Sequence, residues 1–247
     1  MMLKGKVALI TGASRGIGKE ISLLFARNHA DLVLNYRENE AMAAELAAEG
    51  KKYDVKVKTI RADVRNREEV AAMFKQVKQE FGRLDVLVNN AGILRDNLML
   101  MTSEADYDDL MATNLKGTFN CLQFAAKMMM RKQSGKIINL SSVIGRYGNP
   151  GQVVYAGTKA GVIGMTTSSA KELGPFGITV NAIAPGIIET DMISVLRPEF
   201  REKLIEGTAL KRIGKPIDVA KVALFLASDL SDYVSGQVIG VDGCQVI

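Results

Sequence analysis

Hydrophobic residues along the chain gather in short runs that alternate with longer amphipathic stretches. The first run, Val7 to Ile10, is too short for a buried helix and is typical of a strand buried on both faces. Apolar residues then return with helical spacing at Ile17, Ile21, Leu24 and Phe25. The same alternation continues along the chain, which predicts βαβ units and a parallel sheet covered on both faces.

The pattern predicts six further strands and five further helices. The expected strands are Leu32 to Tyr36, Val55 to Ile60, Leu84 to Val88, Lys136 to Leu140, Ile178 to Ile183 and Val238 to Val241. The expected helices are Glu38 to Lys52, Arg67 to Phe81, Ser103 to Lys132, Val153 to Leu173 and Ile217 to Ala227. The section from Pro185 to Gly214 is less regular. We expect a single doubly wound Rossmann domain over residues 1–247, with its ligand at the carboxyl ends of the strands.

A glycine-rich loop joins the first strand to the first helix. It reads TGASRGIG from Thr11 to Gly18, with the spacing GxxxGxG. Gly12 suits a tight turn, while Gly16 and Gly18 let backbone approach a ligand and let the helix close on the sheet. Free N–H groups at the start of that helix favour an anion such as a pyrophosphate. The loop therefore indicates a dinucleotide site, the alternative being an ordinary glycine-rich turn.

Composition and charge exclude several classes of protein. Hydrophobic residues make up 47% of the chain, which excludes disorder as the main state. The 32 basic residues are interleaved with 27 acidic ones, so we expect no nucleic-acid partner. Two cysteines and one histidine are too few for a disulfide framework, a metal site or a Ser-His-Asp triad. No apolar run approaches the roughly 18 residues that span a bilayer, so we expect a cytoplasmic protein without a membrane partner.

The residues after the second strand indicate which nicotinamide cofactor is used. An acidic residue at this position binds the ribose hydroxyls of NAD, whereas an arginine suits the 2′-phosphate of NADP. Here Tyr36 is followed by Arg37, and the first carboxylate is Glu38. Arg15, in the glycine loop, is placed to join Arg37 on the phosphate, because guanidinium groups match phosphate oxygens. We therefore predict NADP(H). The alternative is that Arg37 is only a solvated charge at the start of a helix.

Tyr155 and Lys159 lie one helical turn apart in the helix after the fifth strand. A tyrosine that exchanges a proton at neutral pH needs its pKa lowered by about three units, or roughly 4 kcal/mol. An ammonium about 4 Å away supplies an attraction of that order at an effective dielectric constant of ~20. Ser142, at the end of the preceding strand, is placed to hydrogen-bond a substrate carbonyl. The alternative for the pair is an ordinary contact on a helix surface.

Taken together, these motifs resemble the short-chain dehydrogenase/reductase family over nearly the whole chain. The shared motifs are TGASRGIG at Thr11 to Gly18, Asp63 after the third strand, NNAG at Asn89 to Gly92, Asn114, Ser142, YAGTK at Tyr155 to Lys159, and PG at Pro185-Gly186. The resemblance implies that Tyr155 is the acid/base, that Lys159 lowers its pKa and holds the ribose, and that Ser142 orients the carbonyl. It also implies that Asn114 holds a water that links Lys159 to solvent.

The resemblance and the loop chemistry together assign the cofactor site. Asp63 and Val64 are expected on the adenine, Asn90 to Gly92 along the cofactor, and Ile188 and Thr190 near the carboxamide. The full set of predicted cofactor residues is Gly12, Ser14, Arg15, Gly16, Ile17, Gly18, Arg37, Asp63, Val64, Asn90, Ala91, Gly92, Tyr155, Lys159, Pro185, Gly186, Ile188 and Thr190.

Two stretches narrow the resemblance within the family. Ala91 to Leu100 and Pro185 to Met192 look most like the 3-oxoacyl-[acyl-carrier-protein] reductases, which implies NADPH-dependent reduction of a 3-oxoacyl thioester in fatty acid synthesis. Reductases of acetoacetyl-CoA and of other small ketones are close alternatives. Phe176 stands where that pattern often has a basic residue, and the end of the chain, DGCQVI, departs from the usual tail. An alternative of another class is a non-catalytic NADP-binding sensor or scaffold.

Three features bear on partners. Lys127, Arg131 and Lys132 offer a basic surface for an acidic carrier protein, or they complement the dipole of the helix that they end. The methionines at 99, 101 and 111 line a flexible acyl channel, or they belong to the core. By resemblance, four copies assemble into a homotetramer through the last strand and the long helices, from Asp106 to Arg131 and from Val153 to Leu173.

Overall fold

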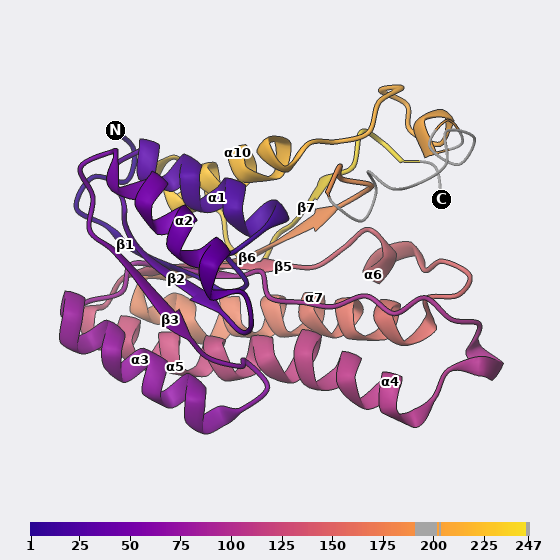
Figure 1. The fold of residues 1–247 in the computed structure, drawn as a ribbon, viewed down its shortest axis with the longest axis horizontal. Coiled ribbons are helices and arrows are strands. Elements are labelled where there is room, and N and C mark those ends of the chain that lie inside the picture. The colour runs from indigo at the N-terminus through magenta and orange to yellow at the C-terminus, as the bar shows by residue number, and fades with distance from the viewer. Residues whose placement is uncertain (191–201, 203, 246–247) are drawn as a thin grey trace.

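Seven strands form one parallel sheet in the order β3-β2-β1-β4-β5-β6-β7 (Figure 1). The structure is a computed structural model that describes residues 1–190, 202 and 204–245. The strands are β1 Val7–Ile10, β2 Asp31–Tyr36, β3 Val57–Arg61, β4 Val86–Asn89, β5 Gly135–Leu140, β6 Ile178–Pro185 and β7 Val238–Val241. The predicted fold class, a doubly wound parallel sheet, is confirmed.

Helices cover both faces of the sheet (Figure 1). One layer contains α1 Gly16–Arg27, α2 Glu40–Lys51 and α10 Pro216–Ala227. The other contains α3 Arg67–Phe81, α4 Glu104–Leu110, the π-helix η2 Met111–Lys116, α5 Gly117–Lys132 and α7 Val153–Leu173. Shorter elements are α6 Ile144–Tyr147 and the 3₁₀ turns η1 Met99–Met101, η3 Gly174–Phe176 and η4 Asp229–Ser231.

Two hydrophobic cores lie on the two faces of the sheet, and β1 contributes to both. Ala8 and Ile10 pack in the core beneath α1 and α10, whereas Val7 and Leu9 pack in the core beneath α3 and α5. Because successive side chains of a strand point to opposite faces, a strand buried on both faces has a continuous apolar run. This explains the pattern that predicted the element.

The chain reverses its direction of winding between β1 and β4. β1 pairs with β2 on one side, with Ile10 opposite Leu34, and with β4 on the other, with Ile10 opposite Val88. The connections that leave β1 and β4 therefore diverge at their carboxyl ends. In sheets of this kind ligands bind in the crevice at that point.

The predicted long helical tract from about Ser103 to Lys132 is confirmed, with helix from Glu104 to Lys132, but the tract is not one uniform α-helix. It is divided by the π-helix η2, which packs against α7 where Gly161 leaves room for Leu115. The structure also contains α6, which the sequence did not predict. By contrast β1, α3, α7 and β7 have the predicted bounds. Part of the irregular section after Pro185 lies outside the described residues.

Candidate active site

Two loops, at the carboxyl ends of β1 and β4, form the base of the site. Gly12 has a φ of +60°, and a Cβ atom there would lie 2.9 Å from the Cα atom of Ala91. A Cβ atom on Gly18 would lie 2.5 Å from the Nδ2 atom of Asn90. That amide donates hydrogen bonds to the carbonyls of Thr11 and Gly12, at 3.0 and 2.9 Å. The glycines are therefore needed because the loop after β4 packs directly against them, as well as for the approach of a ligand.

Asn35 fixes the other side of the glycine loop, and the sequence analysis missed it. It is buried in β2, where its Nδ2 atom donates to the carbonyl of Ala62 at 2.9 Å. Its Oδ1 atom accepts from the amide of Gly12 at 3.4 Å, and its carbonyl accepts from the amide of Ala13 at 2.9 Å. A polar residue inside an otherwise apolar strand is the signal that could have identified it.

A cavity of about 640 Å³ lies along this edge of the sheet. Twelve predicted cofactor residues line it: Gly12, Ser14, Arg15, Gly16, Ile17, Arg37, Asp63, Val64, Asn90, Ala91, Gly92 and Thr190. The lining also includes residues that were not predicted: Asn35, Tyr36, Glu38, Asn39, Met42, Ala62, Ile93 and Thr113. Six predicted cofactor residues are not part of the lining: Gly18, Tyr155, Lys159, Pro185, Gly186 and Ile188.

The segment that begins at Pro185 is anchored by contacts with β7 and Gly214 before it reaches the cavity. Gly186 donates its amide to the carbonyl of Val241 at 3.0 Å. Ile188 is buried and forms an isolated parallel β-bridge with Gly214. A Cβ atom on Gly214 would lie 2.6 Å from the side chain of Ile188. These contacts place Thr190 on the cavity wall. The end of the predicted PGIIETDM motif, residues 191 and 192, lies outside the described residues.

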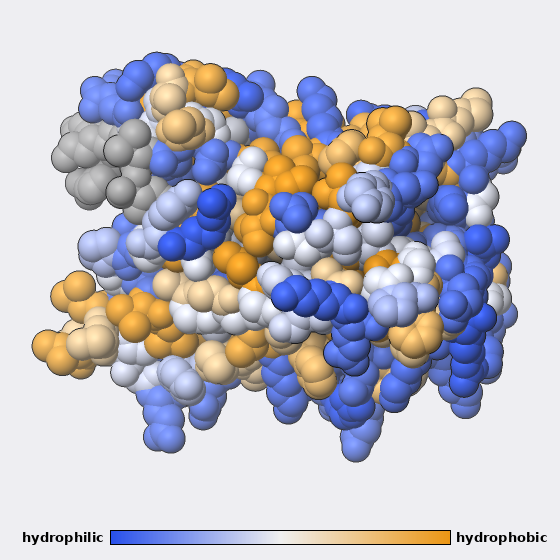
Figure 2. All heavy atoms as spheres, turned by 180° about the vertical axis from the view of Figure 1, so that it is seen from behind, coloured by the Kyte–Doolittle hydropathy of each residue, from blue (hydrophilic) through white to orange (hydrophobic). Residues whose placement is uncertain are grey.

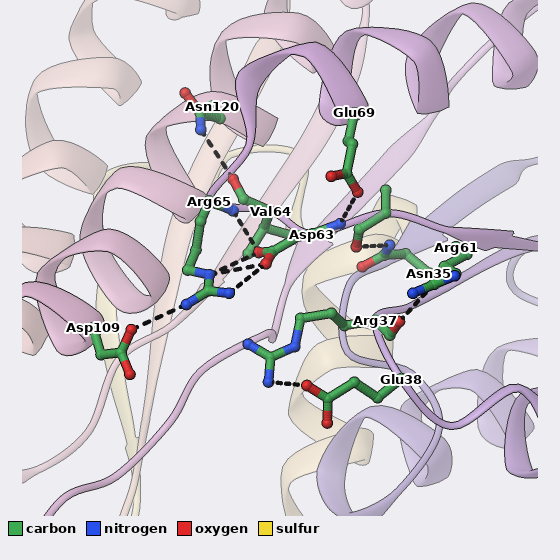
Figure 3. Close-up of polar contacts among 11 residues, drawn as sticks. Asn35, Arg37, Glu38, Arg61, Asp63, Val64, Arg65, Glu69, Asp109 and Asn120 are labelled. Atoms are coloured by element: carbon green, nitrogen blue, oxygen red, sulfur yellow. Dashed lines mark hydrogen bonds and ion pairs between the residues drawn. The ribbon is translucent and has the colours of Figure 1, made fainter. Parts of the chain in front are cut away.

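Arg37 lies at the corner of the cavity, directly after β2 (Figure 3). Its guanidinium group forms an ion pair with the neighbouring Glu38. Its carbonyl accepts a hydrogen bond from the Nε atom of Arg61 at 3.1 Å. Arg61 is opposite Tyr36 in the register of β2 and β3, so the sheet itself brings these arginines together. This corner of the cavity is where a phosphate group would meet cationic side chains.

Asp63 is held by Arg65 through a two-pronged ion pair (Figure 3). The Nε and terminal nitrogens of Arg65 donate to its carboxylate at 2.9 and 2.7 Å, and Arg65 also contacts Asp109 at 3.0 Å. Burial opposes ionisation, but the hydrogen bonds from Arg65 outweigh it and hold the pKa of Asp63 below its ordinary value. The amide of Asp63 donates to Glu69 at 2.8 Å. The loop is thus fixed, with the Asp63 carboxylate ionised and paired to Arg65.

Ser142, Tyr155 and Lys159 meet beyond the same edge of the sheet. Lys159 is buried, and its Nζ atom donates to the carbonyl of Leu140 at 2.9 Å and lies 5.7 Å from the centre of the Tyr155 ring. The Ser142 side chain lies close enough to the Tyr155 phenol to lower its pKa. The predicted serine, tyrosine and lysine are therefore brought together by the end of β5 and one face of α7.

Burial sets the ionisation of both groups on α7. It raises the pKa of Tyr155, against the opposing effect of the Ser142 side chain, and the charge of Asp96 adds to the rise. It lowers the pKa of Lys159 from 10.5 to about 8. The Tyr155 shift is opposite to the one implied by the resemblance, because desolvation outweighs any effect of the amine in the protein alone. In the protein alone the phenol is therefore neutral near neutral pH.

Comparisons with known proteins agree with this geometry. A family model described as Enoyl-(Acyl carrier protein) reductase matches residues 12–244. The 3-oxoacyl-[acyl-carrier-protein] reductase FabG of Staphylococcus aureus (strain Mu50) is 50% identical over 238 residues, which cover 96% of this chain and 97% of the relative. The protein of the same name from Thermotoga maritima is 49% identical over the full length of both chains. The chain belongs to the short-chain dehydrogenase/reductase family.

A solved structure extends this similarity to three dimensions. A crystal structure from Agrobacterium tumefaciens, whose name assigns it provisionally to the gluconate dehydrogenases, superposes with a TM-score of 0.94 at 34% identity. The match covers 98% of this chain and 96% of the other. The resemblance of the sequence to the short-chain dehydrogenase/reductase family is therefore confirmed. The individual roles of the site residues stay predictions.

Asn114 is fully buried in the π-helix, and its side chain binds the loop after β4. Its Oδ1 atom accepts from the amide of Ile93 at 2.8 Å, and its Nδ2 atom donates to the carbonyl of Ile93 at 2.9 Å. The same nitrogen lies 3.3 Å from the hydroxyl of Thr158 on α7. A Cβ atom on Gly92 would lie 3.2 Å from Asn114 Oδ1 and 3.6 Å from Lys159 Nζ. Asn114 therefore joins the cofactor loop to the helix that carries the predicted acid.

The predicted basic surface is divided by the structure. Lys132 forms an ion pair with the buried Asp85, which Arg83 also contacts at 2.7 Å. Lys132 therefore neutralises an internal carboxylate, which the sequence analysis did not anticipate. Lys127 lies over the ring of Phe124, with its Nζ atom 5.5 Å from the ring centre. Arg131 is exposed.

The predicted acyl channel involves the turn η1. Met99 and Met101 are 64% and 68% exposed. Leu98, just before them, and Leu100, between them, are also exposed. Figure 2 shows apolar atoms projecting at one end of the molecule, as expected from these four consecutive residues. The core alternative is therefore wrong for both methionines. The channel itself stays a prediction.

Among the residues that the structure describes, no group of three or more His, Cys, Asp or Glu side chains is placed to hold a metal ion. None of the helices in that part of the chain combines the length and the apolar character needed to cross a membrane.

Proposed function

We propose that this protein reduces a 3-oxoacyl thioester on acyl carrier protein to the 3-hydroxyacyl thioester, with NADPH as the reductant. The observation that carries the proposal is the meeting of Ser142, Tyr155 and Lys159 at the sheet edge that also holds the glycine-lined cavity. The two named FabG relatives support the choice of substrate. We propose that residues 1–247 work as one catalytic domain in fatty acid synthesis.

The residues along the cavity fit a nicotinamide dinucleotide phosphate. Gly12 and Gly16 line the cavity without a side chain, so the loop presents bare main chain there to a pyrophosphate. Thr113 lines the cavity, and its hydroxyl, among the described residues, is buried without a hydrogen-bond partner. A buried hydroxyl of this kind suits a polar ligand. Arg37 and Arg15 would hold the 2′-phosphate, and Asp63 and Val64 would border the adenine.

The chain's own residues perform the proton chemistry. When bound, NADPH supplies the hydride for the carbonyl carbon. Ser142 donates a hydrogen bond that orients the substrate carbonyl, and Tyr155 protonates its oxygen. The phenol is neutral near neutral pH, as a donor requires, although its raised pKa makes it a weaker acid than an ordinary tyrosine. An oxygen that gains charge during reduction is a stronger base than a phenolate, so the transfer is favourable.

Lys159 and Asn114 support that proton transfer. With its pKa near 8, Lys159 is mostly charged at neutral pH and stabilises negative charge as it develops on Tyr155. Asn114 holds the loop at Ile93 in place, which keeps Gly92 next to the amine. We propose that Asn114 also orders the water that connects Lys159 to solvent.

The test follows the loss of NADPH absorbance with four substrates: acetoacetyl-acyl carrier protein, acetoacetyl-CoA, a free small ketone and a trans-2-enoyl thioester. We expect the highest kcat/KM for the carrier-linked 3-oxoacyl substrate. A preference for the CoA substrate or the ketone would favour the small-ketone reductase. Turnover of the enoyl thioester alone would favour the reaction in the family model's description. NADPH binding without turnover of any substrate would favour the sensor.

We propose that four copies assemble through α5, α7 and β7. Phe119 on α5 and Val153 on α7 are exposed, and Gly157 and Gly164 on α7 face open space. Sedimentation analysis would test the homotetramer. Both cysteines of the described chain are free thiols, which supports the proposed cytoplasmic location.

A further inference from the structure

The cation expected to meet the 2′-phosphate already has a ligand. Arg37 is paired with Glu38, whose side chain is 73% exposed, whereas that of Arg37 is 42% exposed (Figure 3). Both residues line the main cavity, and both line a second cavity of about 490 Å³ beside it. The ion pair therefore occupies the position where the phosphate is expected to bind.

The other two carboxylates that line the second cavity have different partners: Asp63 is held by Arg65, and Glu69 accepts from the amide of Asp63. Asp63 receives both prongs of Arg65, so its charge is already compensated by that partner (Figure 3). Arg61 donates a 3.1 Å hydrogen bond to the carbonyl of Arg37 and so fixes its main chain. The guanidinium group of Arg37 forms its ion pair with Glu38. Among the described residues, Glu38 is thus the carboxylate that forms an ion pair with Arg37.

We propose that Glu38 limits the preference of this protein for a 2′-phosphorylated dinucleotide, because its carboxylate is the ligand that the phosphate must displace from Arg37. The inference rests on the proposed use of NADP(H). A phosphate that binds must first break the existing ion pair, and it then lies close to the released carboxylate. Both effects weaken binding of NADP(H) and have no counterpart in NAD(H), which lacks the 2′-phosphate.

The expected effect is modest because the pair is exposed. Exposed ion pairs contribute about 1.5- to 5-fold to an equilibrium constant. Removal of the carboxylate also removes a repulsion from a phosphate group that carries up to two negative charges. We therefore expect Glu38→Gln to lower the Kd of NADP⁺ about three- to ten-fold and to change the Kd of NAD⁺ by less than about two-fold.

The experiment is isothermal titration calorimetry of the full chain with NADP⁺ and with NAD⁺, which needs no turnover. The variants are Glu38→Gln and the matched control Glu40→Gln, which removes the same charge two residues further on. Glu40 is exposed and is not part of the cavity lining. Circular dichroism melting of each variant verifies that it is folded before titration.

We expect tighter binding of NADP⁺ by Glu38→Gln alone. An unchanged Kd for NADP⁺ in Glu38→Gln would overturn the inference while leaving the proposed function intact. Equal tightening by Glu40→Gln would also overturn it, since the effect would then be a diffuse one of net charge. If the unmodified protein bound neither dinucleotide, the proposed function would fail together with the inference.

Discussion

Replacement of Lys159 by methionine should make the protein inactive but more resistant to unfolding near neutral pH. The Nζ atom is buried, and burial lowers the pKa of Lys159 from 10.5 to about 8. In the unfolded chain the amine keeps its ordinary pKa. A shift of about 2.5 units corresponds to about 3 kcal/mol. The folded protein carries this penalty wherever the amine is charged in both states.

The sign of the pH dependence follows from proton binding. Between about pH 8 and pH 10.5 the unfolded chain binds the proton of Lys159 and the folded protein does not. The free energy of unfolding therefore rises with pH in this window. Lys159→Met lacks this contribution. Its advantage over the unmodified protein should thus fall by about 3 kcal/mol from neutral pH to about pH 10.5. The lost hydrogen bond to Leu140 offsets part of the advantage at every pH.

The measurement is urea unfolding of the cofactor-free protein at a series of pH values and a fixed protein concentration. Circular dichroism is the suitable signal, because the chain contains no tryptophan. The control is Lys171→Met, near the exposed end of the same helix, for which the difference from the unmodified protein should not vary with pH. Parallel pH curves for Lys159→Met and the unmodified protein would refute the argument that burial of the amine is unfavourable.

Three other substitutions test the site. Tyr155→Phe should lower kcat about 10²- to 10⁴-fold while leaving the Kd of NADPH unchanged in fluorescence titrations, and a near-normal rate would exclude the phenol as the acid. Arg37→Ala should raise the Kd of NADPH at least about ten-fold and leave that of NADH unchanged, since a charge-assisted hydrogen bond is lost. Gly18→Ala should destabilise the protein by about 1–3 kcal/mol in urea unfolding, because its Cβ would lie 2.5 Å from Asn90. The control is Gly174→Ala, where the backbone is right-handed with a φ of −52° and a Cβ meets open space. It should not destabilise the protein, and equal effects of the two alanines would contradict the packing argument.

Much of the fold was predictable because local pattern and burial agree. The run from Val7 to Ile10 is apolar because both faces of β1 are buried, and the helix from Arg67 to Phe81 ends at Gly82, which has a φ of +71°. The π-helix was not predictable. It depends on contacts of Leu115 and Asn114 with α7, which carry no local signature of the Gly or Pro type.

The site was predictable in its chemistry and less so in its electrostatics. The spacing of Tyr155 and Lys159 placed them on one helix face, and in the structure the Tyr155 side chain lies next to both Lys159 and Ser142. The direction in which the pKa of Tyr155 shifts depends on how deeply the phenol is buried, and the spacing of residues in the sequence does not reveal that. In the same way, the partner of Lys132 is a carboxylate far away in the sequence. Pairings of this kind are set by the tertiary fold.

The four residues from Asn90 to Ile93 set the distance between the glycine loop and the helix that carries Tyr155. One end is tied to the glycine loop through the amide of Asn90, and the other is tied through Asn114 to the helix of the phenol. The distance between the glycine loop, which would bind the nucleotide, and Tyr155 is thereby fixed. It cannot change with the length of an acyl chain. Adjustment to longer or shorter substrates must therefore take place elsewhere, so substitutions that alter chain-length selectivity should leave the reacting groups undisturbed.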